Sequence, residues 1–173
     1  ADLEVLRCAV IRKAAQRLCP AAARTRLVGL APAPTMARQL IMSWGMAVLI
    51  DVFGEPGSCF LVDSDGLSPK RVYDALVESI MDQVPVTLIG ASFGFVHLLD
   101  WLATQGHELE LLPGSRTMDA GGYKGRSREV TREWLDQEIE RRLSVKPPYA
   151  VNLLGMTELS SQFYDDVLRE GSV

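Results

Sequence analysis

The chain has 173 residues, of which 47% are hydrophobic and 23% charged, and its formal net charge is −4 at pH 7. These values are typical of one soluble domain with a full core, and they exclude a disordered chain and a basic nucleic-acid-binding protein. The apolar runs are shorter than the roughly 20 residues that span a bilayer, and no signal peptide is visible, so we expect no membrane span. Cys8, Cys19 and Cys59 are odd in number and lack metal-ligand spacing, so we expect free thiols in a reducing cytoplasm.

Strand-like and helix-like patterns alternate along the chain. The first helix places Leu3, Leu6, Val10 and Ile11 on one face and ends at Pro20. Short, β-branched or apolar runs predict strands near 26–30, 59–63, 85–89, 116–120 and 149–154. Amphipathic or apolar runs between and after them predict helices within 35–54, 68–83, 91–107, 127–144 and 158–170.

Helix boundaries carry recognisable signals. Ser68 fits an N-cap followed by Pro69 at the first helical position, and Gly106 fits the end of the helix before it. Ser127 fits another N-cap, for a helix that turns Val130, Trp134 and Ile139 inward. The alternation predicts an α/β fold: a Rossmann-like three-layer domain over residues 1–173, with a mostly parallel sheet and helices on both faces.

Ligands of such sheets bind beyond the carboxyl ends of the strands, which directs attention to three loops. The first, "GASFG" at 90–94, matches the G-x-S-x-G pattern of a nucleophile elbow with Ser92 as nucleophile. The histidine partner would have to be His97, about one helical turn later, or His107. The alternative is structural: the glycines allow a tight turn, and Ser92 caps the following helix.

The second loop, "DAGGYKG" at 119–125, combines glycines with Lys124 and, just beyond, Arg126 and Arg128. Glycines let a ligand approach the backbone, and free N–H groups with positive charge suit an anion or nucleotide. The spacing fits a flexible turn with solvated charges equally well.

The third loop, "GMTE" at 155–158, follows the last predicted strand. Gly155 permits close approach, the Thr157 hydroxyl can bind an anion, and Glu158 can ligate Mg²⁺. Physical chemistry alone favours a plain helix N-terminus, with a threonine cap and an early glutamate.

The three loops together resemble a known family. "LLGMTE" is similar to the YGxTE signature of the acyl- and aryl-adenylating enzymes, with Leu154 where an aromatic residue is usual. The order of "PVTLIGASFGFVHLLDWL", "MDAGGYKGRSREVTREWL" and "VNLLGMTELSSQFYD", preceded by "LAPAP" and "FGEPGSCFLVDSDGL", resembles the LuxE-type acyl-protein synthetases, which are related to phenylacetate-CoA ligase. The resemblance covers nearly the whole chain from about residue 27.

The resemblance implies a reaction and a set of site residues. A carboxylic acid, expected to be a fatty acid, would be activated with ATP and Mg²⁺ as an acyl-adenylate and then passed to a protein thiol or another acceptor. The implied roles are these: Gly121, Gly122, Tyr123, Gly155, Met156 and Thr157 for the nucleotide, Thr157 and Glu158 for catalysis, Glu158 for the metal, and Ser92, Phe93, Gly94 and Phe95 for the acyl group.

Parts of the family pattern are not visible in this sequence. No serine- and glycine-rich phosphate loop precedes residue 27, and only 15 residues follow Glu158, where the family has a ribose-binding aspartate and a lysine. We therefore expect the chain to be a central subdomain of a longer adenylating enzyme and to be a poor catalyst alone. A non-catalytic interaction domain and a Ser92 hydrolase are the alternatives.

Overall fold

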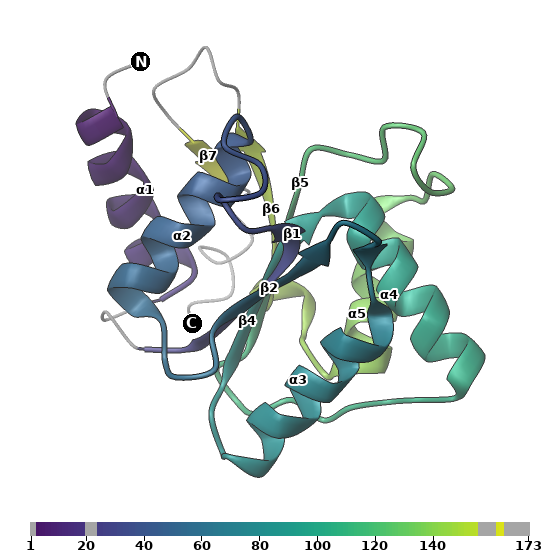
Figure 1. Cartoon of the computed structure of the whole chain (residues 1–173). Coiled ribbons are helices and arrows are strands. Elements are labelled where there is room, and N and C mark those ends of the chain that lie inside the picture. Colours follow the sequence, from purple (N-terminus) through teal and green to yellow (C-terminus); the bar gives the residue numbers. More distant parts are fainter. Residues whose placement is uncertain (1–2, 20–23, 156–161, 165–173) are drawn as a thin grey trace.

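The computed structural model describes residues 3–19, 24–155 and 162–164, and these form a seven-stranded sheet with helices on both faces (Figure 1). The strand order is β3-β2-β1-β4-β5-β6-β7. The parallel strands are β1 (Arg26–Pro32), β2 (Cys59–Asp63), β4 (Val86–Ala91), β5 (Arg116–Ala120) and β6 (Ala150–Gly155). Short antiparallel strands, β3 (Gly66–Leu67) and β7 (Gln162–Tyr164), close the two edges. The predicted fold class and the five predicted strands are confirmed.

The helices form the outer layers. Helices α1 (Leu3–Arg17) and α2 (Ile41–Phe53) cover one face of the sheet, and α3 (Pro69–Met81), α4 (Ser92–Gln105) and α5 (Arg132–Leu143) cover the other (Figure 1). A 3₁₀ turn, η2 (Pro147–Tyr149), leads into β6. None of the helices in the described part of the chain is long and apolar enough to cross a membrane.

The central strands are apolar on both sides because each face packs against helices. In β1, Val28 and Leu30 belong to the core cluster under α3, α4 and α5, whereas Leu27 and Ala31 belong to the cluster under α1 and α2. Successive side chains of a strand point to opposite faces, so a strand between two helical layers reads as a continuous apolar run. The buried "RLVGLAP" pattern of β1 has this cause.

Two of the four predicted boundary signals are found in the structure. The Ser68 hydroxyl accepts a hydrogen bond from the backbone N–H of Arg71, and Pro69 is the first residue of α3. Gly106 ends α4 in the left-handed conformation, with φ of 70°. This conformation lets its N–H reach the last carbonyls of the helix without a side-chain clash.

The other two boundary predictions are wrong. Thr131, not Ser127, caps α5: its hydroxyl accepts the N–H of Trp134 at 3.2 Å, whereas the Ser127 hydroxyl donates to the carbonyl of Arg128. The N-cap of α4 is Ala91, so Ser92 lies inside the helix and is not its cap. Helix α5 thus uses another cap-forming residue four positions later, whereas α4 begins without a side-chain cap.

The predicted final helix is also incorrect where the structure describes it. Residues 162–164 form β7, whose Phe163 pairs with Leu154 of β6. Without β7, the outer side of β6 would leave backbone groups unpaired, and aromatic residues are favourable in strands. The rest of that predicted helix lies outside the described residues.

Candidate functional site

The carboxyl ends of β1 and β4 form a topological switch point. From β1 the chain crosses to β2 on one side, while β4, on the other side of β1, continues to β5 and β6. The connections after these two adjacent strands therefore diverge, and a crevice is left between them. In this structure the crevice is a cleft of about 1550 Å³, lined by the ends of β1, β2 and β4, the β1–α2 loop, the start of α4 and the β5–α5 loop.

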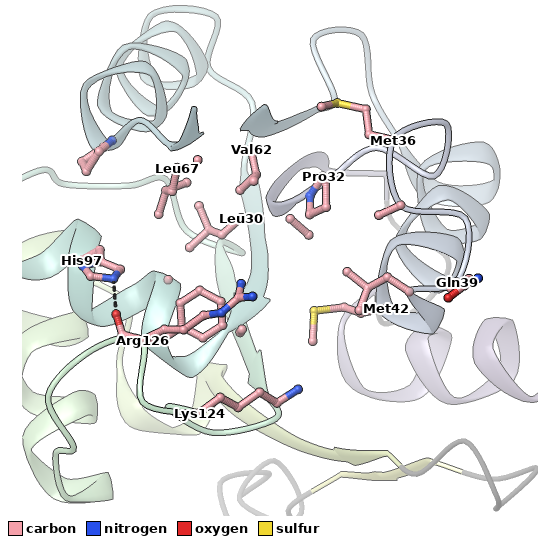
Figure 2. A pocket seen from close by; sticks show the side chains of 18 of the residues that line it. Leu30, Pro32, Met36, Gln39, Met42, Val62, Leu67, His97, Lys124 and Arg126 are labelled. Carbon is pink, nitrogen blue, oxygen red and sulfur yellow. Dashed lines mark hydrogen bonds between the residues drawn. The ribbon is translucent and has the colours of Figure 1, made fainter. Parts of the chain in front are cut away.

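Most of the cleft wall is apolar. Leu30 and Pro32 come from β1, and Val62 and Leu67 come from β2 and β3. Methionines Met36 and Met42 lie on the opposite side of the cavity from Lys124 and Arg126 (Figure 2). Methionine is unbranched and flexible, so such a wall can adapt to an apolar ligand of variable shape.

The charged groups of the cleft all have the same sign. Arg38, Lys124 and Arg126 line it, and no carboxylate does so among the described residues. This contrasts with the chain as a whole, which carries a net charge of −4. A concave site with apolar walls focuses the field of its cations and favours an anionic ligand.

The backbone around Lys124 holds a left-handed conformation. Lys124 has φ of 51°, and Gly121, Gly122 and Gly125 also have positive φ values of 76°, 66° and 66°. Glycine adopts such angles freely, but a lysine there costs on the order of 1 kcal/mol. Lys124 therefore combines an unfavourable backbone conformation with a position in the cleft lining.

A hydrogen bond joins the β5–α5 loop to α4. His97 Nε2 lies 2.9 Å from the backbone oxygen of Arg126, as Figure 2 shows, and so donates to it. The Arg126 guanidinium lies 5.4 Å from the centre of the Phe93 ring, which is a favourable cation–π contact. These two contacts hold the basic loop against the wall that Phe93 and Gly94 form.

The four residues predicted to bind the acyl group are divided by the structure. Phe93 and Gly94 line the cleft. Phe95 is fully buried in the core cluster under α3, α4 and α5 and does not line it. Ser92 is buried at the start of α4, and its hydroxyl donates to Asp119 Oδ2 at 2.8 Å.

Asp119, the first residue of the "DAGGYKG" stretch, is the centre of a buried polar network and was not among the predicted site residues. Its carboxylate also accepts from Asn152 Nδ2 at 3.0 Å and from Arg132 Nη1 at 2.5 Å. Arg132 in addition donates to the Ala150 carbonyl. Burial alone would lower the pKa of Arg132, but the carboxylates of Asp119 and Asp136 outweigh it and raise that pKa. The network links α4, β5, α5 and β6 directly before the glycine turn.

The geometry of Ser92 does not match a nucleophile elbow. Such an elbow is a strained strand-to-helix turn with an exposed serine that bonds to a histidine. Ser92 is 4% exposed and is not among the residues with positive φ. In the part of the chain that the structure covers, its partner is Asp119, and His97 is bonded to Arg126 instead.

The predicted nucleotide-binding residues are only partly described. Gly121 and Gly122 form the turn after β5, and the Tyr123 hydroxyl donates to the carbonyl of Val130 at 3.0 Å. Burial, reinforced by the charge of Asp119, raises the pKa of Tyr123. Gly155 is the last residue of β6. Residues 156–158, which include Met156, Thr157 and Glu158, lie outside the described residues.

The described residues offer no metal site of their own. Within ranges 3–19, 24–155 and 162–164, no group of three or more His, Cys, Asp and Glu side chains could hold an ion. The cleft lining fits an anion and supplies no ligand that Mg²⁺ prefers. Glu158, the predicted metal ligand, lies outside the described residues.

The sequence contained a signal for part of the cleft. The basic, glycine-rich stretch identified the cations Lys124 and Arg126, whereas Met36 and Arg38 had no motif to mark them.

Comparison with models of protein families finds none that matches the chain, and no curated protein matches it.

Proposed function

We propose that this chain forms part of the acid-activating site of an adenylate-forming ligase. We further propose that this enzyme acts in the cytoplasm. A carboxylate oxygen of the substrate attacks the α-phosphorus of ATP, and pyrophosphate leaves. The acyl group of the acyl-adenylate then passes to a thiol. The observation that carries this proposal is the cleft at the switch point, with apolar walls and cations but no described carboxylate in its lining. An amphipathic anion, such as a fatty acid or its acyl-adenylate, fits that combination.

Each wall of the cleft has a role in this proposal. Lys124 and Arg126 attract the carboxylate and, after activation, the phosphate of the adenylate. Leu30, Met36 and Met42 contact the hydrocarbon chain. Positioning matters because two anionic reactants must be held within reacting distance, and cations offset their repulsion. Mg²⁺, bound through Glu158, would further neutralise the phosphates of ATP.

The cysteines support the proposed compartment. Cys8, Cys19 and Cys59 are all free thiols. Cytoplasmic proteins rarely form disulfides because the compartment is reducing. Free thiols support a cytoplasmic site for the reaction.

Binding of a stable acyl-adenylate mimic tests the proposal directly. We expect dodecanoyl-sulfamoyl adenosine to bind with a favourable heat in calorimetry, and Lys124→Ala and Arg126→Ala each to weaken it about tenfold, which corresponds to about 1.4 kcal/mol. The control is Lys70→Ala, because Lys70 is exposed on α3 and pairs with Asp74. Equal affinity for the acetyl and dodecanoyl mimics would contradict an apolar acyl site.

Pyrophosphate exchange distinguishes the reaction classes. In an active protein that contains this chain, Glu158→Gln should depress exchange more than Ser92→Ala, because a metal ligand acts on the reacting phosphates and Ser92 is a buried partner of Asp119. A Ser92→Ala variant that loses ester hydrolysis while Glu158→Gln retains it would favour a serine hydrolase instead.

A further inference from the structure

We propose that the mouth of the cleft is a docking surface for an acidic protein that carries the acceptor thiol. This inference rests on the proposed function, because it concerns the transfer that follows acid activation. The surface, called the rim below, consists of the following residues: Met36, Arg38, Leu40, Ile41, Lys124 and Arg126.

The rim exposes large apolar side chains within one short segment. Met36 is 55% exposed, Leu40 38% and Ile41 39%. Single exposed apolar residues are common on protein surfaces. Three exposed apolar side chains within one short segment beside a cleft are typical of an interaction site. Met36 and Leu40 also line the cleft, so the apolar wall continues outward onto the surface.

The charge of the rim selects the kind of partner. Arg38, Lys124 and Arg126 carry the positive charge of the rim, and the described cleft lining includes no carboxylate to neutralise them. At the end of β2, Asp63 is paired with Arg71 at 2.7 Å, and the turn that follows carries the exposed carboxylate of Asp65. Complementary potentials speed association and determine which partners fit, so the rim favours an acidic surface with apolar side chains at its centre.

The position of the rim suits the acceptor. The cleft is lined by the carboxyl ends of β1, β2 and β4 and by residues of the β1–α2 and β5–α5 loops. The rim residues belong to these two loops and to the start of α2, so an acceptor thiol that enters between the loops passes the rim. A macromolecule whose thiol reaches the cleft must contact the rim as it does so.

Charge variants at Ile41 test docking without altering the cleft. Ile41 is the first residue of α2 and does not line the cleft. A glutamate there is compatible with the positive end of the helix, so the fold should persist. The probe is a purified small acidic carrier protein that bears a phosphopantetheine thiol, immobilised for surface plasmon resonance.

The variants should separate the rim from the rest of the surface. We expect Ile41→Glu to weaken carrier binding about tenfold at low salt, through repulsion of like charges and loss of an apolar contact. Ile41→Lys should lose less affinity for the carrier than Ile41→Glu does. The difference in affinity between the two variants should become smaller at high salt, which screens the charges. Met81→Glu is the control: Met81 is 77% exposed at the end of α3, which lies towards the amino ends of the strands, and this variant should bind as the unmodified chain does.

Two further measurements separate this proposal from the proposed function. All three variants should bind dodecanoyl-sulfamoyl adenosine as tightly as the unmodified chain does. If neither the variants nor the unmodified chain bind this mimic, the proposed acyl site is wrong, whether or not the carrier binds. If the mimic binds but the carrier does not, or if Ile41→Glu and Ile41→Lys bind the carrier equally, the docking proposal is wrong. Stronger binding to anionic vesicles or to single-stranded DNA than to the carrier would also overturn it.

Discussion

At the scale of single residues, Lys124 combines strain with a placed charge. Its φ of 51° is unfavourable for an L-residue with a side chain, and its neighbour Gly125 shares the left-handed conformation. Lys124→Gly should raise the free energy of unfolding by up to about 1 kcal/mol because the strain is relieved. Lys124→Ala keeps the strain and should be no more stable than the unmodified chain.

The two variants of Lys124 should nevertheless lose ligand affinity together. Both remove the ammonium group, so both should bind the acyl-adenylate mimic about tenfold more weakly. Urea unfolding and calorimetry on the same samples check the two effects. If Lys124→Gly gains no stability over Lys124→Ala, the backbone of the loop is not strained in solution.

The buried carboxylate of Asp119 should dominate the stability of the polar network. Asp119 is 3% exposed, and Asp119→Ala leaves Arg132 without one of its two carboxylate partners. Removing one member of a buried ion pair costs about 3 kcal/mol or more. Ser92→Ala removes one hydrogen bond and should cost about 1.5 kcal/mol. Chemical denaturation of the two variants measures both, and equal losses would contradict the central position of Asp119.

At the scale of secondary-structure elements, two glycines face Leu30 of β1, one from β4 and one from α4. A Cβ atom added at Gly90 would lie 2.5 Å from Leu30 Cβ, whereas one added at Gly94 would lie 3.4 Å from the same atom. Gly90 therefore permits close packing of β4 against β1, and Gly94 leaves space between α4 and the same leucine.

Alanine substitutions at these glycines should differ accordingly. Gly90→Ala forces Leu30 to move and should lower the free energy of unfolding by about 1–3 kcal/mol. At Gly94, where φ is not positive, alanine makes ordinary contact and favours the helix by about 1 kcal/mol, so Gly94→Ala should not destabilise the fold. Thermal unfolding checks both. A Gly94→Ala variant as unstable as Gly90→Ala would contradict the packing described.

At the scale of the whole molecule, alkaline pH should weaken the fold through Cys19. This thiol is 2% exposed in the cluster under α1 and α2, and its burial, partly offset by the charge of Arg116, raises its pKa from 9.0 to about 11. Between these values the unfolded thiol loses its proton while the folded one keeps it. The unfolded state then binds fewer protons, so the free energy of unfolding falls as pH rises.

The effect should be measurable by comparison with a variant. Between pH 9 and 11, the free energy of unfolding of the unmodified chain should fall by about 2 kcal/mol more than that of Cys19→Ala. The upper limit is about 2.7 kcal/mol, which corresponds to a pKa difference of two units. The quantity compared is the slope of stability against pH, so a constant cost of the alanine does not interfere. Parallel slopes would show that Cys19 is not buried as a neutral thiol.

The sequence by itself determined the fold class, because local patterns report local physics. Doubly buried strands need continuous apolar residues, as in β1 and β4, and the Ser68–Pro69 start and the Gly106 end of helices depend on a few neighbouring atoms. The glycine-rich basic stretch likewise marked one wall of the cleft, because its glycines and cations are adjacent in the chain.

Only the tertiary structure decided what these elements form together. It placed Phe93 and Gly94 in the cleft but Phe95 in the core, and it gave Ser92 to Asp119, 27 residues away. It also added Met36 and Arg38 to the cleft and paired residues 162–164 with β6. The physical reason is that these contacts join residues distant in the chain: their geometry follows from strand order and helix placement, which no local pattern encodes.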